Sequence, residues 1–135
     1  MTSGVSAVLF VKDVPRMARF YGDVMGLAIV EADGATATLR AGEFHLVLHA
    51  IPPAIADTIV LTSPPELRAD VPVKLAFPVA SLVRARGAAA ALGGGLSPEH
   101  TEWRSAGGRI CDGFDPEGNV VQFREARGEL DRSAT

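Results

Sequence analysis

A polar side chain stands between apolar neighbours near the end of the chain. The sequence Asp-Pro-Glu-Gly at 115–118 suits a type I turn, and its glycine can adopt the left-handed conformation that closes a hairpin. Strand alternation after this turn places Val121 and Phe123 on one face and Gln122 on the other. Because the larger apolar pair should meet the helices, we expect Gln122 to face whatever space the other side of the sheet encloses.

Another predicted strand carries two histidines at alternate positions, and these could bind a metal ion. His45, Val47 and His49 share one face, and the two imidazoles are potential ligands of a metal ion. Histidines without a carboxylate on a facing strand are more often pocket or surface residues, so both interpretations stay open. His100, in a loop with acidic neighbours, is expected to be exposed.

The composition of the chain limits the classes of protein to which it can belong. A chain of 135 residues with 47% hydrophobic content is long and apolar enough to form one domain with a core. Its net charge of -3 argues against nucleic acid as a main partner, and no segment has the length of a membrane span. The N-terminus lacks the pattern of a signal peptide, which predicts a cytoplasmic protein. Cys111, the single cysteine, cannot form an internal disulfide and is expected to be buried.

The elements that must position these residues begin with a strand and an amphipathic helix. An apolar run over 5–11 predicts the strand, Asp13 is placed as the helix cap, and Gly26 ends the helical pattern. Three further strands are expected at 28–32, 35–41 and 44–50. The proline-rich segment 51–72 is predicted to be a connection, with a short strand expected at 58–61.

The same order of elements returns after this connection. A shift of 68 positions, from Val5 to Val73, lays the first strand, cap, helix and glycine stop on a second set. This set is a strand at 73–79, the cap Ser81, a helix at 82–92 and strands at 101–104, 109–114 and 119–125. The sequence thus predicts two βαβββ modules, at about 4–50 and 73–126, and a disordered tail at 127–135.

The modules and two motifs resemble those of a known superfamily. The segment Phe-Tyr-Gly-Asp-Val-Met-Gly-Leu at 20–27 and the Asp-Pro-Glu-Gly-Asn motif at 115–119 look like those of the vicinal oxygen chelate superfamily. This superfamily contains glyoxalase I, bleomycin-resistance proteins and extradiol dioxygenases. The resemblance covers nearly the whole chain, as one domain over 1–135. It implies an α+β fold in which two βαβββ modules form an open, U-shaped barrel around one cleft, with the helices outside.

The resemblance also identifies four positions at which metal-binding members carry their ligands. These members usually have histidine on the first strand of each module, seven residues before the helix cap, and glutamate or an equivalent on each last strand. Ser6 and Lys74 fall at the first-strand positions, and Gln122 falls at one last-strand position. The fourth position falls on the strand that contains His45, Val47 and His49, and the sequence leaves its register open by two residues. Because a divalent ion needs three or four imidazole or carboxylate ligands, we expect no metal and no cofactor.

Lys74 has two interpretations within such a cleft. Its stem can pack at the cleft mouth while the ammonium reaches water or a carboxylate. Alternatively, an ammonium close to the neutral donors Ser6 and Gln122 would bind an anionic or strongly polarised ligand group. We expect these three side chains to converge on one cleft. A Schiff-base role would need a depressed lysine pKa and a nearby acid, and the sequence indicates neither.

Strand parity completes the predicted lining of the cleft, which is mainly apolar with a few polar groups. Trp103 is placed at the cleft edge, where core or interface filling is the alternative role. The candidate ligand-binding residues are Ser6, Val8, Phe10, His45, Val47, His49, Lys74, Trp103, Gln122 and Arg124.

Two classes of function follow from these residues. The first is a metal-independent binding protein of the bleomycin-resistance type, which takes a small, partly apolar molecule into the cleft. The second is a metal-dependent, glyoxalase-like lyase, isomerase or dioxygenase with an unusual ligand set built on His45 or His49. The ligand positions favour the first class, and no catalytic residue is assigned. A homodimer is expected, because superfamily members commonly pair modules within a chain or between chains.

Overall fold

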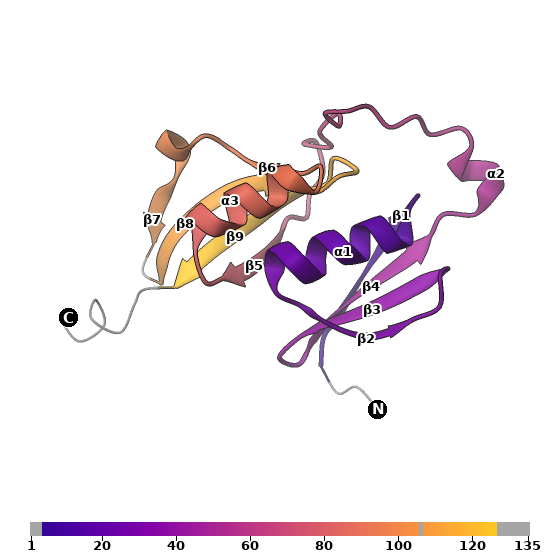
Figure 1. The fold of residues 1–135 in the computed structure, drawn as a ribbon, viewed down its shortest axis with the longest axis horizontal. Helices are drawn as coiled ribbons and strands as arrows, with labels where there is room; N and C mark the ends of the chain where they lie inside the picture. Colours follow the sequence, from indigo (N-terminus) through magenta and orange to yellow (C-terminus); the bar gives the residue numbers. More distant parts are fainter. Residues whose placement is uncertain (1–3, 106, 127–135) are drawn as a thin grey trace.

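The structure, a computed structural model, describes residues 4–105 and 107–126. The first half contains β1 (Ser6–Val11), α1 (Val14–Met25), β2 (Ala28–Ala32), β3 (Thr36–Ala41), β4 (Phe44–Ala50) and the short α2 (Pro53–Ala56). The second half contains β5 (Leu75–Val79), α3 (Leu82–Ala91), β6 (Gly95–Leu96), the 3-10 helix η1 (Glu99–Thr101), β7 (Trp103–Ser105), β8 (Gly108–Phe114) and β9 (Val120–Ala126), as Figure 1 shows. The tail predicted to be disordered, 127–135, lies outside the described residues.

Two sheets with matching strand order form the framework. The first sheet has the order β1-β4-β3-β2, and the second has the order β5-β9-β8-β6, with β7 also pairing with β8. In each sheet the first and last strands of the module pair in parallel, and the other pairs are antiparallel. The α+β fold of paired modules is therefore confirmed, with two open sheets and no closed barrel among the described residues.

Three predictions of individual strands differ from the structure, and the first is the strand predicted at 73–79, because β5 begins at Leu75 and leaves Lys74 just before it. Residues 58–61 form no strand; α2 lies just before them instead, with Pro52 at the N-cap and Pro53 at the first helical position, where a proline loses no helical hydrogen bond. The strand predicted at 101–104 is also wrong in its bounds, because η1 separates the edge strand of the second sheet into β6 and β7. The second module therefore has one more strand than the first.

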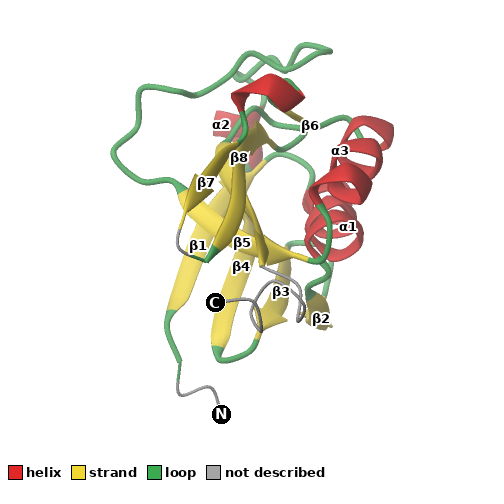
Figure 2. Ribbon diagram, turned by 90° about the vertical axis from the view of Figure 1, so that its left-hand side faces the viewer, coloured by secondary structure: helices red, strands yellow, loops and turns green. Residues whose placement is uncertain are grey.

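Both long helices lie on one side of the sheets, as Figure 2 shows. The side chain of Asp13 accepts from the backbone N–H of Arg16 at 3.1 Å to cap α1, and Ser81 does the same for Arg84 at 3.2 Å to cap α3. α1 ends at Gly26, whose φ of 71° is left-handed. The helices and the covered sheet faces share one core, which includes Met17, Phe20, Tyr21, Leu39, Leu46, Leu48, Phe77, Leu82, Ala89, Val121 and Phe123.

The turn before β9 joins the second module to the start of α1. Both carboxylate oxygens of Glu117 accept from the backbone N–H of Lys12, at 2.9 and 3.0 Å, and one also accepts from that of Asp13 at 2.9 Å. The Tyr21 hydroxyl donates to the Asp115 carboxylate at 2.7 Å. Glu117 and Asp115 are 2% and 0% exposed, so these are interior contacts. We call this group of residues, 115–119 with Lys12, Asp13 and Tyr21, the module latch.

The interior position of the latch alters its acid–base behaviour. Burial raises the pKa of Asp115, although hydrogen bonds from Tyr21 and Asn119 oppose this rise. Burial, together with the negative charge of Asp115, raises the pKa of the Tyr21 hydroxyl well above its ordinary value.

Residues 4–105 and 107–126 contain no helix long and apolar enough to cross a membrane.

The single tyrosine gives a direct test of the latch. The folded chain holds the phenolic proton more tightly than the unfolded chain does, so the free energy of unfolding should fall as pH rises above about 10. We expect tyrosinate absorbance to appear together with unfolding, measured by circular dichroism, and not before it. Tyr21→Phe should lose about 1.5–3 kcal/mol of stability at neutral pH and show a weaker alkaline decline. Tyrosinate formation near pH 10 in a folded protein would contradict this account.

Candidate functional site

The faces of the two sheets that lie opposite the helices carry the predicted site residues. We call them the open faces. On the first sheet, strand pairing forms three rows across β1, β4 and β3: Ser6–His45–Arg40, Val8–Val47–Thr38 and Phe10–His49–Thr36. Val8 is 55% exposed and Phe10 is 56% exposed, whereas Leu46 and Leu48 of the opposite face are fully buried. The six candidate residues of the first module therefore share one face, on which His45 is buried and the other five are at least partly accessible.

The two histidines of this surface differ in their environments. His45 is 7% exposed, and its Nδ1 has no hydrogen-bond partner among the described residues. His49 is exposed, and its Nδ1 donates to the backbone carbonyl of Ala50 at 2.9 Å, which leaves Nε2 as an acceptor. The His49 ring centroid lies 5.4 Å from that of Phe10. Arg40, paired with His45 across the sheet, adds a positive charge to the same row.

A chain of polar contacts crosses the open face of the second sheet. The Lys74 ammonium lies 3.0 Å from Asp112 Oδ2, and the Gln122 amide donates to Asp112 Oδ1 at 3.4 Å. Arg124 Nε then donates to Gln122 Oε1 at 2.8 Å. Three of these four residues were predicted as site residues from sequence. We call Lys74, Asp112, Gln122 and Arg124 the polar chain.

Asp112 is the member of the polar chain that sequence reasoning missed. It pairs with Gln122 across β8 and β9, so the two side chains lie on the same face. A single acidic residue within the apolar run of β8 was the available signal. Lys74 meets this carboxylate, as the first of its two interpretations expected.

Trp103 lies on the same face as the polar chain. Strand pairing forms the row Trp103–Ile110–Arg124–Pro78 across β7, β8, β9 and β5. Trp103 is 41% exposed, whereas Ile110 is 6% exposed. An apolar strip therefore runs beside the polar chain and includes its arginine.

The structure brings together only part of the predicted cleft. Lys74 and Gln122 both contact Asp112, so they converge as expected. Ser6 belongs to the other sheet, and within the described part of the chain no hydrogen bond or ion pair joins it to the polar chain.

Between the two sheets lies a separate apolar cavity of about 300 Å³. Its lining comes from β1, from the end of the connection and from the start of β9, and it includes Val8, Leu9, Arg68, Val71, Val73 and Val120. Strand parity in the sequence predicted Val8 and also Val120, which shares a face with Gln122. Arg68 and Val71 were missed because the connection carries no periodic pattern, and Leu9 was missed because parity places it on the opposite face of β1 from Val8.

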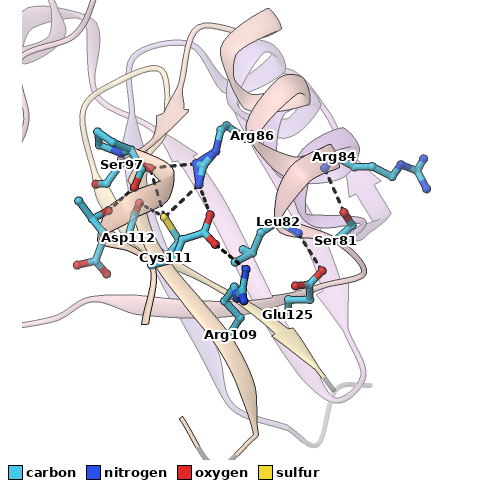
Figure 3. A network of polar contacts seen from close by, with 12 residues as sticks. Ser81, Leu82, Arg84, Arg86, Ser97, Arg109, Cys111, Asp112 and Glu125 are labelled. Atoms are coloured by element: carbon cyan, nitrogen blue, oxygen red, sulfur yellow. Dashed lines mark hydrogen bonds and ion pairs between the residues drawn. The ribbon is translucent and has the colours of Figure 1, made fainter. Parts of the chain in front are cut away.

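A second polar network lies between α3 and the covered face of the second sheet, as Figure 3 shows. Arg86 donates to Glu102 and, at 2.9 Å, to the carbonyl of Ser97, and Arg109 lies 3.6 Å from Glu102. Cys111 is fully buried here, as predicted, and burial raises the pKa of its thiol. His100 is exposed, also as predicted. Because this polar network lies on the side of the sheet that α3 covers, we assign it a structural role within the second module.

The strand register relates one residue of β4 to Gln122. The shift of 68 places Val8 on Ala76; Val8 pairs with Val47, and Ala76 pairs with Gln122. Val47 is therefore the counterpart of Gln122. With this counterpart, the resemblance implies a serine, a valine, a lysine and a glutamine at the four ligand positions. Within the described residues, no group of three or more His, Cys, Asp or Glu side chains is arranged to hold a metal ion.

These modules and their motifs define a protein of the paired βαβββ class. Residues 6–123 match the family model of the glyoxalase-like domain, and the chain belongs to this family. None of the curated proteins matches the chain.

Solved structures show the same fold. A glyoxalase/bleomycin resistance protein/dioxygenase family enzyme from Burkholderia phytofirmans PsJN has a TM-score of 0.64 at 19% identity, covering 90% of this chain and 97% of its own. A protein of unknown function from Agrobacterium tumefaciens str. C58 has a TM-score of 0.61 at 26% identity, with 94% and 96% covered. The bleomycin-binding protein from Streptomyces verticillus has a TM-score of 0.55 at 21% identity, with 94% and 98% covered.

The ion pair of Lys74 predicts a small effect on stability. The two side chains are 42% and 33% exposed, and exposed pairs contribute about 0–1 kcal/mol. We expect Lys74→Met to change the free energy of unfolding by less than about 1 kcal/mol in urea denaturation. Arg86→Met is the comparison, because it removes a partner of Glu102, which is only 8% exposed, and should cost clearly more. Equal losses in the two variants would contradict this assignment.

Proposed function

We propose that the protein binds a small, partly apolar molecule on its open faces and does so without a metal ion. The observation that carries this proposal is the strand pairing of Val8 with Val47 and of Ala76 with Gln122, which supports Val47 as the counterpart of Gln122. Together with Ser6 and Lys74, which the superfamily resemblance implies as ligand positions, these residues form a poor set of metal ligands. Valine offers no donor atom, and an ammonium repels a divalent cation. This set does not fit the metal of the metal-dependent members.

The remaining side chains suit the binding of an organic molecule. The open faces combine apolar groups, such as Val8, Phe10 and Trp103, with the hydrogen-bonding groups of the polar chain. Small-molecule sites typically have this mixture of apolar surface and a few polar groups. The structural similarity to a protein described as bleomycin-binding supports a binding role for this fold.

A metal-dependent, glyoxalase-like lyase, isomerase or dioxygenase is the second candidate. His45 favours it, because a buried imidazole nitrogen without a partner is unusual and can serve as a ligand. Its neighbours count against this role, since Ser6 and Arg40 flank it in the row and neither supplies a carboxylate or imidazole. The binding protein is therefore the better supported function.

We also propose that the protein is a homodimer whose second copy covers part of the open faces. Val8 and Phe10, on the edge strand β1, are 55% and 56% exposed in the single chain. Exposed apolar surface on an edge strand commonly marks an interaction site. A second copy would also enclose a ligand that an open sheet leaves accessible to water.

The metal content of the purified protein tests the first proposal. Because the donor set is poor, elemental analysis should find no stoichiometric zinc, iron, nickel or manganese after purification without added metal and gel filtration. Close to one equivalent of any of them would refute metal independence. In that case, His45→Ala and His49→Ala would show whether the second candidate's ligands hold the ion.

The mass in solution tests the dimer. We expect light scattering to give twice the chain mass at micromolar concentration. Val8→Glu should shift this mass to that of a monomer, because it places a charge within the apolar contact. Val83→Glu is a matched control, since Val83 is 80% exposed on α3, away from the open faces, and should remain dimeric. A wild-type monomer throughout this range would refute the proposal.

A further inference from the structure

We propose that Arg124 selects the ligand by binding a carboxylate group, while the apolar body of the ligand lies along the exposed Trp103 and Pro78. This inference rests on the proposed binding function and names the chemical class of ligand. It assigns recognition to Arg124, although the sequence had directed attention to Lys74.

The charge balance of the polar chain supports Arg124 as the anion-binding group. Lys74 and Asp112 neutralise each other at 3.0 Å. Gln122 adds a hydrogen bond to the same carboxylate and carries no charge. No carboxylate forms an ion pair with Arg124 within residues 4–105 and 107–126. The uncompensated positive charge of the polar chain therefore lies on Arg124.

Hydrogen bonds also fix the direction in which this guanidinium points. Asp112 accepts from the Gln122 amide nitrogen, so the Gln122 oxygen faces Arg124 and accepts from Nε at 2.8 Å. The Nε–H group is thus occupied within the protein. The edge formed by the two terminal nitrogens remains for a ligand, and this edge binds both oxygens of a carboxylate in a planar, bidentate arrangement.

The row that contains Arg124 suggests what is attached to that carboxylate. Trp103 and Ile110 lie on one side of Arg124 and Pro78 lies on the other. Trp103 is 41% exposed and offers accessible apolar surface within the row. A ligand with an apolar group beside its carboxylate would contact both kinds of surface. A neutral ligand would remove water from the Arg124 guanidinium without supplying a carboxylate in its place, and leaving a covered charge unpaired is unfavourable.

The single tryptophan of the chain allows binding to be measured at the site itself. The probes are benzoate and octanoate, each compared with its neutral amide of nearly the same shape. Acetate serves as a carboxylate with almost no apolar body. Quenching or shift of Trp103 fluorescence reports contact with the row, and calorimetry gives the affinity independently of fluorescence.

The variants separate charge from geometry. Arg124→Met removes the guanidinium, and Arg124→Lys keeps the positive charge but cannot bind a carboxylate in the same bidentate way. Arg104→Met is the matched control. Arg104 follows Trp103 directly in β7 and pairs with Arg109, so its side chain projects from the opposite face. Thermal unfolding of each variant shows that the fold is retained.

We expect benzoate or octanoate to bind more tightly than its amide and more tightly than acetate. Arg124→Met should weaken carboxylate binding by about tenfold to a hundredfold and remove the preference over the amide. Arg124→Lys should fall between Met and wild type, and Arg104→Met should bind like wild type.

Two outcomes overturn the inference in different ways. If amides bind as tightly as carboxylates, or if Arg124→Met leaves carboxylate affinity unchanged, Arg124 is not the selective group, and the proposed binding function stands. If no carboxylate or amide of the series binds at millimolar concentration, both this inference and the binding function proposed for the open face are refuted.

Discussion

The rest of the structure depends on a buried carboxylate at the start of the first helix. Glu117 comes from the turn of the second module, yet it accepts three hydrogen bonds from Lys12 and Asp13 of the first. A carboxylate is favourable there, because helix N-termini present free N–H groups and a partial positive charge. Asp115 and Tyr21 add a second contact between the modules. The arrangement of the two sheets, and hence of their open faces, follows from these bonds together with the shared core.

Local patterns in the sequence predicted most of the fold. Caps at Asp13 and Ser81, the glycine stop at Gly26 and the alternation of β9 all have short-range causes, and each appears in the structure. The structure of the connection at 51–72 was harder to predict, because its prolines interrupt any periodic pattern and its contacts are with distant residues such as Gly118. The division of the edge strand by η1 was missed for a similar reason, since three residues of 3-10 helix carry little signal.

The sequence predicted on which strand face each candidate residue lies, but it predicted less well which residues contact one another. Parity correctly placed Gln122 opposite Val121 and Phe123, which are buried. Parity within one strand does not reveal which residue lies opposite on the next strand, so Asp112 and its bond to Lys74 were not foreseen. The same limit applied to the choice among His45, Val47 and His49, for which the pairing of β1 with β4 supports Val47 as the counterpart of Gln122. Cross-strand register is a long-range property.

The module latch has a consequence for the newly made chain. Its bonds join residues 94 to 105 positions apart, so nearly the whole chain must be synthesised before Glu117 reaches the first helix. Until then, the N–H groups of Lys12 and Asp13 rely on water, and the apolar side of α1 lacks its contacts with the second module. Contacts of such long range slow folding and prolong the exposure of apolar surface. During translation the first module should thus be the vulnerable half, dependent on chaperones or on rapid completion of the C-terminal turn.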